Sequence, residues 1–350
     1  MPGFDLDALV GAVRQNCHIS DAQFAGDLTL CTFLLKMREL YRWENAIPLT
    51  QEMPKSEVGD WMNTRGQLWD DLESAPYVPL PLPSGAVDAF ESARVNADLL
   101  ARGYVYSGGY GRHCKPHFFL AELDRHERRD GFDIYVAGRE LARDLEAPPG
   151  MYLDRALFIR TEALRRWLWE KYEEWRWSKK NEAMGRALAT YPFADAPEAA
   201  LDAMVATEQE SVILHELGEA LAGEELAQPW DDLLVTAMRS RAEIVLRAAR
   251  DLYADCRALL PGLAERENPA ALHFYFANLV GLRRKLAPDL VQAYEDWLAS
   301  GDWQTISVAA EAGLAHWRGQ IAGMLALHAE IGDSAPAAIE QRLAPKERAA

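Results

Sequence analysis

Residues 116–137 read PHFFLAELDRHERRDGFDIYVA, and this stretch sets the expected fold apart from a purely helical one. Two β-rich runs, residues 116–123 and 132–137, flank the charged turn Arg128-Arg129-Asp130-Gly131. Apolar runs joined by an Asp-Gly turn are typical of a β-hairpin. Together with the strand-like residues 104–106, they predict a small antiparallel sheet over residues 103–138.

Outside this stretch the apolar residues have helical spacing. The segments expected to be helical are 5–17, 21–45, 54–74, 86–102, 138–146, 154–187, 196–225, 229–260, 268–283, 288–299 and 303–330. Ser20 is a natural N-cap for the second of these helices. We therefore predict a mainly α protein, a multi-helix, bundle-like single domain over residues 1–330 with a small antiparallel β-sheet inserted at 103–138. A frayed C-terminal tail is expected over residues 331–350.

Composition narrows the classes of function. The chain has 350 residues, 49% of them hydrophobic, and a formal net charge of -17. So acidic a chain disfavours general binding to nucleic acid, which requires a basic surface. No run of about 18 apolar residues occurs, so no membrane span is expected. No secretory signal is visible, and the four cysteines lie far apart without a CxxC pair, so a reducing cytoplasmic location is expected.

The segment EQESVILHELGE, residues 208–219, offers the first candidate site. On a helix, Glu208, His215 and Glu219 fall on one stripe because steps of seven and four residues return to nearly the same angle. An imidazole with two carboxylates suits a partial metal site, with iron or zinc as the expected metal, or an acid/base site. Asp251 and Asp255 share the face of another helix and are further candidate ligands, or groups that orient His215. The competing interpretation of residues 208–219 is a half-solvated helix face. The competing interpretation of Asp251 and Asp255 is an intrahelix salt bridge.

Two arginines and a histidine form a second candidate site. Arg139 and Arg143 follow the predicted hairpin at four-residue spacing, where they would hold a carboxylate or phosphate, or else join a structural ion network. His117 ends the glycine-containing loop 107–117, which either faces the ligand, with His117 as a further substrate-binding residue, or is an ordinary glycine turn. The Trp-rich segment 165–180 interleaves aromatic and basic residues, but its glutamates favour core packing over nucleobase stacking.

Six short runs combine to resemble a known family. They are CHISDA (17–22), LYRWE (40–44), KPHFFLAEL (115–123), GRELARDL (138–145), HELGE (215–219) and DLYAD (251–255). Together they are similar to an uncharacterised bacterial family, a domain of unknown function, over residues 10–310. That family has no established activity, so the resemblance assigns no catalytic role to any residue. Because it covers nearly the whole chain, it implies one continuous unit.

The expected function follows from the two candidate sites. The leading hypothesis is a metal-dependent enzyme, with oxidoreductase chemistry as one option, that acts on a small anionic substrate. The alternative is a non-catalytic interaction or regulatory protein whose polar clusters only fix the register of its helices. The expected partner is accordingly a small molecule or another protein, and neither nucleic acid nor a membrane.

Overall fold

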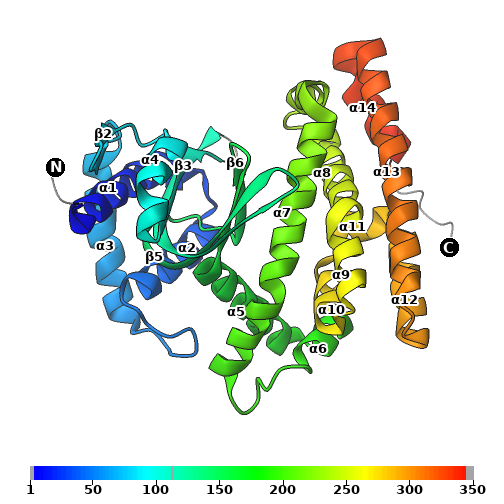
Figure 1. Ribbon diagram of the computed structural model, residues 1–350, viewed down its shortest axis with the longest axis horizontal. Coiled ribbons are helices and arrows are strands. Elements are labelled where there is room, and N and C mark those ends of the chain that lie inside the picture. Colours follow the sequence, from blue (N-terminus) through cyan, green and yellow to red (C-terminus); the bar gives the residue numbers. More distant parts are fainter. Residues whose placement is uncertain (1–3, 112–113, 344–350) are drawn as a thin grey trace. The chain divides into compact units, whose positions relative to one another are not determined.

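A computed structural model describes residues 4–111 and 114–343 of the chain. The chain divides into two compact units, residues 1–170 and 171–350, which are described separately (Figure 1). The expectation of a single domain over residues 1–330 concerns how these units associate, and it stays a prediction.

The N-terminal unit combines helices with two sheets. Its helices are α1 (Leu6–Phe24), α2 (Leu30–Glu44), α3 (Lys55–Leu72), α4 (Ser92–Leu99) and the beginning of α5 (Thr161–Ser178). Its strands are β1 (Leu80–Leu82), β2 (Gly85–Val87), β3 (Tyr104–Tyr110), β4 (Pro116–Arg129), β5 (Phe132–Arg143), β6 (Gly150–Leu153) and β7 (Ala156–Arg160).

The larger sheet has five strands in the order β3-β4-β5-β7-β6. β5 and β7 are parallel, and the other neighbours are antiparallel. Both faces of the sheet are buried, because Phe118 and Leu120 of β4 pack in the core with α1 and α4 while Phe119 and Ala121 pack on the opposite face. This explains why β4 reads as an apolar run without polar alternation. β1 and β2 form a separate antiparallel pair.

The expected mainly α class, a helical bundle with a small inserted sheet, is therefore wrong, and the protein is an α+β fold. The predicted antiparallel hairpin over 103–138 is present, but the sheet extends beyond it. The segment expected to be helical at 138–146 continues β5 to Arg143, which lies opposite Phe119 of β4. β7 occupies the start of the segment expected to be helical from residue 154, and β6 lies just before that segment. Strand partners distant in sequence outweigh the local four-residue spacing of charges.

The first helix also differs from the expectation. α1 continues through Ser20, whose buried hydroxyl donates to the carbonyl oxygen of Pro116. The second helix instead begins after Thr29, whose side-chain oxygen accepts from the backbone N–H of Thr32. The Ser20 hydroxyl therefore makes a tertiary hydrogen bond instead of capping the start of a helix, as its local capping preference had suggested.

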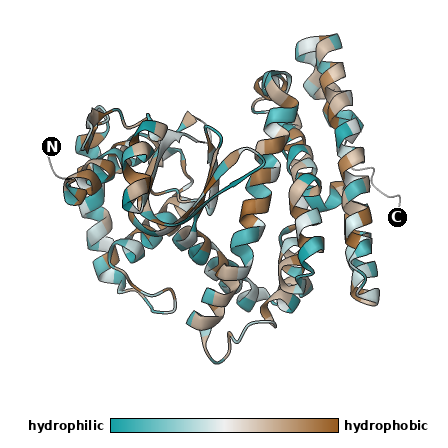
Figure 2. Cartoon of the chain, in the orientation of Figure 1, coloured by the Kyte–Doolittle hydropathy of each residue, from teal (hydrophilic) through white to brown (hydrophobic). Residues whose placement is uncertain are grey.

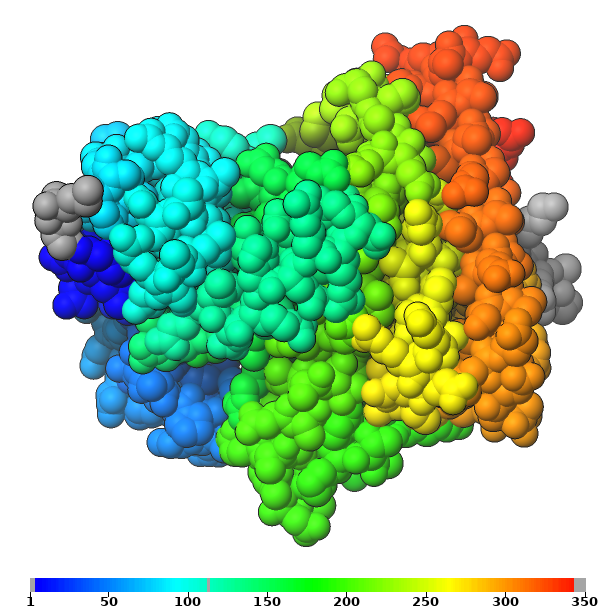
Figure 3. All heavy atoms as spheres, in the orientation of Figure 1, coloured from blue at the N-terminus to red at the C-terminus, as the bar shows by residue number. Residues whose placement is uncertain are grey.

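The C-terminal unit is helical in its described part. Its helices are α6 (Glu182–Leu188), α7 (Pro197–Thr236), α8 (Arg241–Ala254), α9 (Leu260–Arg266), α10 (Pro269–Asn278), α11 (Gly281–Leu286), α12 (Pro288–Ser300), α13 (Gln304–Ile331) and α14 (Ala335–Leu343). Hydrophilic and hydrophobic residues alternate along the long helices (Figure 2). α12 packs on α13, and both are exposed in the orange part of the surface in Figure 3.

Two irregularities shape this unit. A π-helical segment, Asp255–Leu259, joins α8 to α9. α7 is kinked at Ala227, where the backbone is left-handed (φ 51°), two residues before Pro229. Residues 335–343, expected within the frayed tail, form α14 with Ala335 and Ile339 buried in the core.

The Trp-rich segment is only partly buried. Trp169 is 8% exposed, whereas Trp177 is 90% exposed, so the expectation of core packing is wrong for Trp177. Among the described residues no helix is both long and apolar enough to cross a membrane.

Candidate functional site

The helical unit brings the predicted histidine between two carboxylates. Nδ1 of His215 on α7 lies 2.9 Å from Oδ1 of Asp255, the first residue of the π-helical segment, and Nε2 lies 3.3 Å from Oε1 of Glu219. The His215 side chain is 31% exposed, and Asp255 is fully buried. The predicted carboxylate from another helix is thus Asp255. Tyr275 (3.1 Å) and Arg283 donate to its other oxygen.

These contacts form a closed cluster of ion pairs. Burial by itself lowers the pKa of His215, but the hydrogen bonds to Asp255 and Glu219 overcome this and hold the pKa well above its ordinary range. Burial opposes ionisation of Asp255, yet Arg283 and His215 bring its pKa below the ordinary value. Glu219 also pairs with Arg250 at 3.2 Å. An imidazolium held by charged partners is a structural cation, which is poorly suited to bind a metal.

The predicted metal site is therefore wrong. In the described part of the chain, no group of three or more His, Cys, Asp or Glu side chains is placed to hold a metal ion. Glu208 is 1% exposed and one of its oxygens has no described hydrogen-bond partner, so burial raises its pKa to about 8. Asp251 is half-buried, and burial followed by Glu219 raises its pKa. His215 already uses both ring nitrogens on carboxylates, which removes the imidazole ligand that the hypothesis required.

The N-terminal unit contains a different site, which we name the arginine cavity. It has a volume of about 370 Å³, and its apolar wall includes Ile47, Pro48 and Leu49 from the segment that follows α2. Four glutamates also line it. The other charged lining residues are Arg14, Arg42, Arg139, Arg143, Arg165 and Arg166. A cavity of this size accommodates a small molecule.

Arg143, near the end of β5, is the most deeply buried of these cations. Its side chain is 2% exposed, and its closest acidic contact is Glu140, with Nη1 and Oε2 separated by 3.9 Å. Nε and Nη2 have no hydrogen-bond partner among the described residues. The guanidinium lies over the Trp43 ring, 5.2 Å from its centroid. Burial, followed by repulsion from Arg166, lowers the pKa of Arg143 to about 10.

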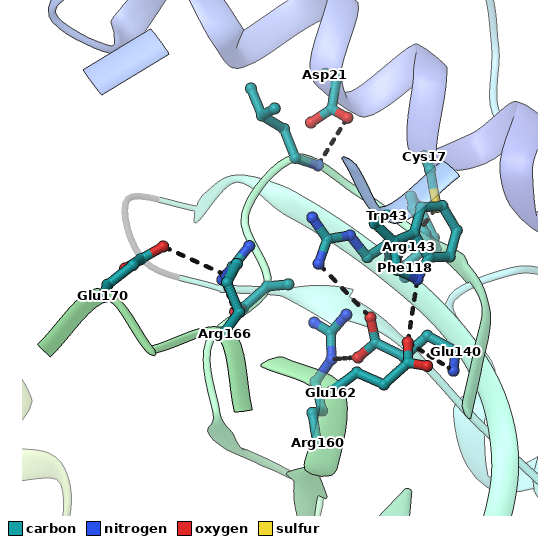
Figure 4. A network of polar contacts seen from close by, with 12 residues as sticks. Cys17, Asp21, Trp43, Phe118, Glu140, Arg143, Arg160, Glu162, Arg166 and Glu170 are labelled. Atoms are coloured by element: carbon teal, nitrogen blue, oxygen red, sulfur yellow. Dashed lines mark hydrogen bonds and ion pairs between the residues drawn. The ribbon is translucent and has the colours of Figure 1, made fainter. Parts of the chain in front are cut away.

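The carboxylate nearest to Arg143 is committed to another arginine. Figure 4 shows Glu140 reached by both Arg143 and Arg160, and the Arg160 contact is the shorter at 2.6 Å. Burial works against ionisation of Glu140, but Arg160 overcomes this and lowers its pKa. Glu162 accepts from Nε1 of Trp43 at 3.1 Å and from the backbone N–H of Glu140 at 3.2 Å. Arg143 consequently has only a long ion pair with Glu140 and no hydrogen bond to it.

Two further arginines are anchored so that they line the same cavity. Arg42 on α2 donates to the carbonyl oxygens of Pro48 and Gln51, which holds the apolar wall in place. Arg166 on α5 donates to the carbonyl oxygen of Ala147 at 2.7 Å. Nε of Arg42 and Nε of Arg166 are also buried without a hydrogen bond among the described residues. The cavity is therefore lined by three arginines that each retain a buried nitrogen without a hydrogen bond among the described residues.

The cavity unites part of the predicted substrate site. Arg139 and Arg143 both line it, although Arg139 is exposed and pairs with Glu122 at 2.8 Å. His117 on β4 does not line it, and burial lowers the pKa of His117 to about 4. Residues 112 and 113 of the neighbouring loop lie outside the described residues. Sequence reasoning missed Arg42 and Arg166, and the available signal was an arginine among apolar neighbours on a helix.

Comparison with known proteins leaves the activity open. One family model, described as the N-terminal domain of a family of unknown function (DUF6866), matches residues 8–160. A second, described as the C-terminal domain of the same family, matches residues 165–346. No curated protein and no solved structure matches the chain.

Proposed function

Because the chain belongs to the family of unknown function DUF6866, we propose its function from its own geometry: the N-terminal unit binds a small organic anion in the arginine cavity. The observation that carries this proposal is the buried Arg143 guanidinium with two unpaired nitrogens. A buried charged donor without a hydrogen bond costs about 1–3 kcal/mol or more, so native proteins rarely keep one. An anionic ligand would supply the missing partner.

The chemistry of the cavity specifies the ligand class. A guanidinium offers two parallel N–H donors that match the oxygens of a carboxylate or a phosphate. Ile47 and Leu49 add an apolar wall beside these donors, which suits a short aliphatic portion of the ligand. The favoured ligand is therefore an organic anion with a small apolar body.

A non-catalytic role is the second candidate for the helical unit. The closed ion pairs around His215 support it, because His215 connects α7 to Asp255 of the π-helical segment, and Asp255 connects that segment to Arg283 of α11. In this interpretation the cluster fixes the register of the helices. We also propose a cytoplasmic location, supported by the free state of Cys17, Cys31, Cys114 and Cys256.

Calorimetric titration of the full chain tests the binding proposal. The probes are butanoate, succinate and propyl phosphate, with 1-propanol as a neutral control. At least one anion should bind, and Arg143→Gln should weaken it by about 10- to 100-fold, since hydrogen bonds to a charged group contribute about 1.5–3 kcal/mol. Arg143→Lys should lie between, because it keeps the charge and loses the two parallel donors.

Arg125→Gln is the matched control. Arg125 lies on the neighbouring strand β4 outside the lining of the cavity, and its side chain is 45% exposed and pairs with Glu127. Its replacement should change the Kd by less than about threefold. Failure of all three anions to bind, or equal binding by wild type and a folded Arg143→Gln protein, would contradict the proposal. Circular dichroism of each variant establishes that it is folded.

A further inference from the structure

The side chains that line the arginine cavity carry more positive than negative charge. Six arginines and four glutamates line it. Ion partners outside the lining include three more arginines and two more glutamates, so they do not remove the excess. These outside partners are Arg38, Arg65, Arg160, Glu122 and Glu170. The excess of at least two positive charges exists in a protein whose overall net charge is -17.

The unsatisfied donors come from more than one arginine. Arg42, Arg143 and Arg166 project from α2, β5 and α5 and each has a buried nitrogen without a hydrogen bond among the described residues. Two of these nitrogens have a carboxylate only at longer range, 3.4 Å from Nε of Arg42 and 3.7 Å from Nε of Arg166. A single carboxylate can pair with one guanidinium in the bidentate arrangement and leaves the other two unsatisfied.

The geometry points to a dianion as the ligand of this cavity, an inference that rests on the proposed anion-binding function and specifies its ligand. A doubly charged group balances the excess charge and has enough oxygens for more than one guanidinium. Two kinds of molecule carry this chemistry at neutral pH, a phosphate monoester and a short dicarboxylate. The volume of about 370 Å³ and the apolar wall limit either one to a short aliphatic body.

Comparison of singly and doubly charged ligands of similar size tests this inference. Full-length protein is titrated calorimetrically at pH 7.5 and low ionic strength with butanoate, succinate and propyl phosphate. At least one dianion should bind about tenfold or more tightly than butanoate, because the second charge meets a cation at short range and low effective dielectric. Succinate and propyl phosphate distinguish the two sources of the dianion.

A second measurement uses the charge of the ligand as the variable. Phosphate monoesters lose their second charge around pH 6, so the affinity for propyl phosphate should fall severalfold between pH 7.5 and pH 5.5. Butanoate keeps its single charge over this range, since carboxyl pKa values are about 4–5. The affinity for butanoate therefore reports any change in the protonation of the protein itself. Such a change can involve Glu39 and Glu162, whose pKa values burial raises.

The outcomes separate this inference from the function on which it rests. Equal or tighter binding of butanoate would overturn the dianion and leave anion binding intact. No binding of any anion would refute both. Tighter binding of the dianions that is unchanged in folded Arg143→Gln protein would place them at another site and would also overturn the inference.

Discussion

Replacing Glu208 with glutamine should stabilise the protein at neutral pH. Glu208 on α7 is 1% exposed, and its Oε1 atom has no hydrogen-bond partner among the described residues. Burial raises its pKa from an ordinary value of 4.5 to about 8, and the nearby Ser211 hydroxyl offsets only part of that shift. Glutamine has nearly the same shape and never ionises, so it removes the cost of keeping this carboxyl neutral.

The magnitude follows from linkage between protonation and folding. The folded carboxyl binds its proton more tightly than the unfolded one, so the stability from this group is full below pH 4.5 and is lost as the pH rises to about 8. At pH 7 the loss is about 3 kcal/mol, taking about 1.4 kcal/mol per pH unit above 4.5. Glu208→Gln should therefore add up to about 3 kcal/mol at pH 7 and less than about 1 kcal/mol near pH 5.

Urea denaturation of both proteins at pH 5 and pH 7, followed by far-UV circular dichroism, measures this difference. Glu224→Gln is the control, because Glu224 is exposed on the same helix and its replacement should change the free energy of unfolding by less than about 0.5 kcal/mol at either pH. An equal effect of Glu208→Gln at both pH values, or destabilisation at pH 7, would refute the reasoning.

Three further tests, made with five substitutions, concern the packing of the molecule. His215→Ala should lower the free energy of unfolding by about 2 kcal/mol, because it removes one partner of a buried carboxylate that keeps two others; an unchanged urea midpoint would contradict the closed ion cluster. Gly218→Ala would place a Cβ 2.4 Å from a backbone oxygen of α8 and should destabilise by about 2 kcal/mol, whereas Gly223→Ala, with nothing within 4 Å, should stabilise by about 0.5–1 kcal/mol. The reverse order of these two midpoints would show that α7 and α8 approach differently. Trp169→Ala should cost about 3–5 kcal/mol, and Trp177→Ala should cost almost nothing because its side chain is already in solvent; equal losses would count against the exposure of Trp177.

Local patterns predicted much of the secondary structure. The runs at 116–123 and 132–137 form β4 and β5 around the Asp-Gly turn, and the spacing of apolar residues located most helices of the C-terminal unit. The stripe argument also placed His215 beside Glu219, since both lie on one face of α7. These features depend on residues within a few positions of one another, where backbone geometry alone decides which side chains meet.

The pairing of the long sheet could not be predicted in this way. Residues 138–143 have charges at four-residue spacing, which suits a helix, but this part of β5 pairs with β4, while residues 133–137 also pair with β7. A strand is stabilised by partners that are distant in sequence, so its local pattern is a weak guide. The same holds for Ser20, which is occupied by a hydrogen bond to Pro116 rather than by a helix start.

The sequence by itself determined a helical C-terminal half, a hairpin and the neighbourhood of His215. Only the tertiary structure decided which charges are satisfied. It surrounds His215 with Asp255 and Glu219, which saturates the imidazole, and it brings Arg42, Arg143 and Arg166 together from α2, β5 and α5 around one cavity. Desolvation and the distance to counter-ions set the energy of each charge, and both depend on atoms contributed by the whole fold.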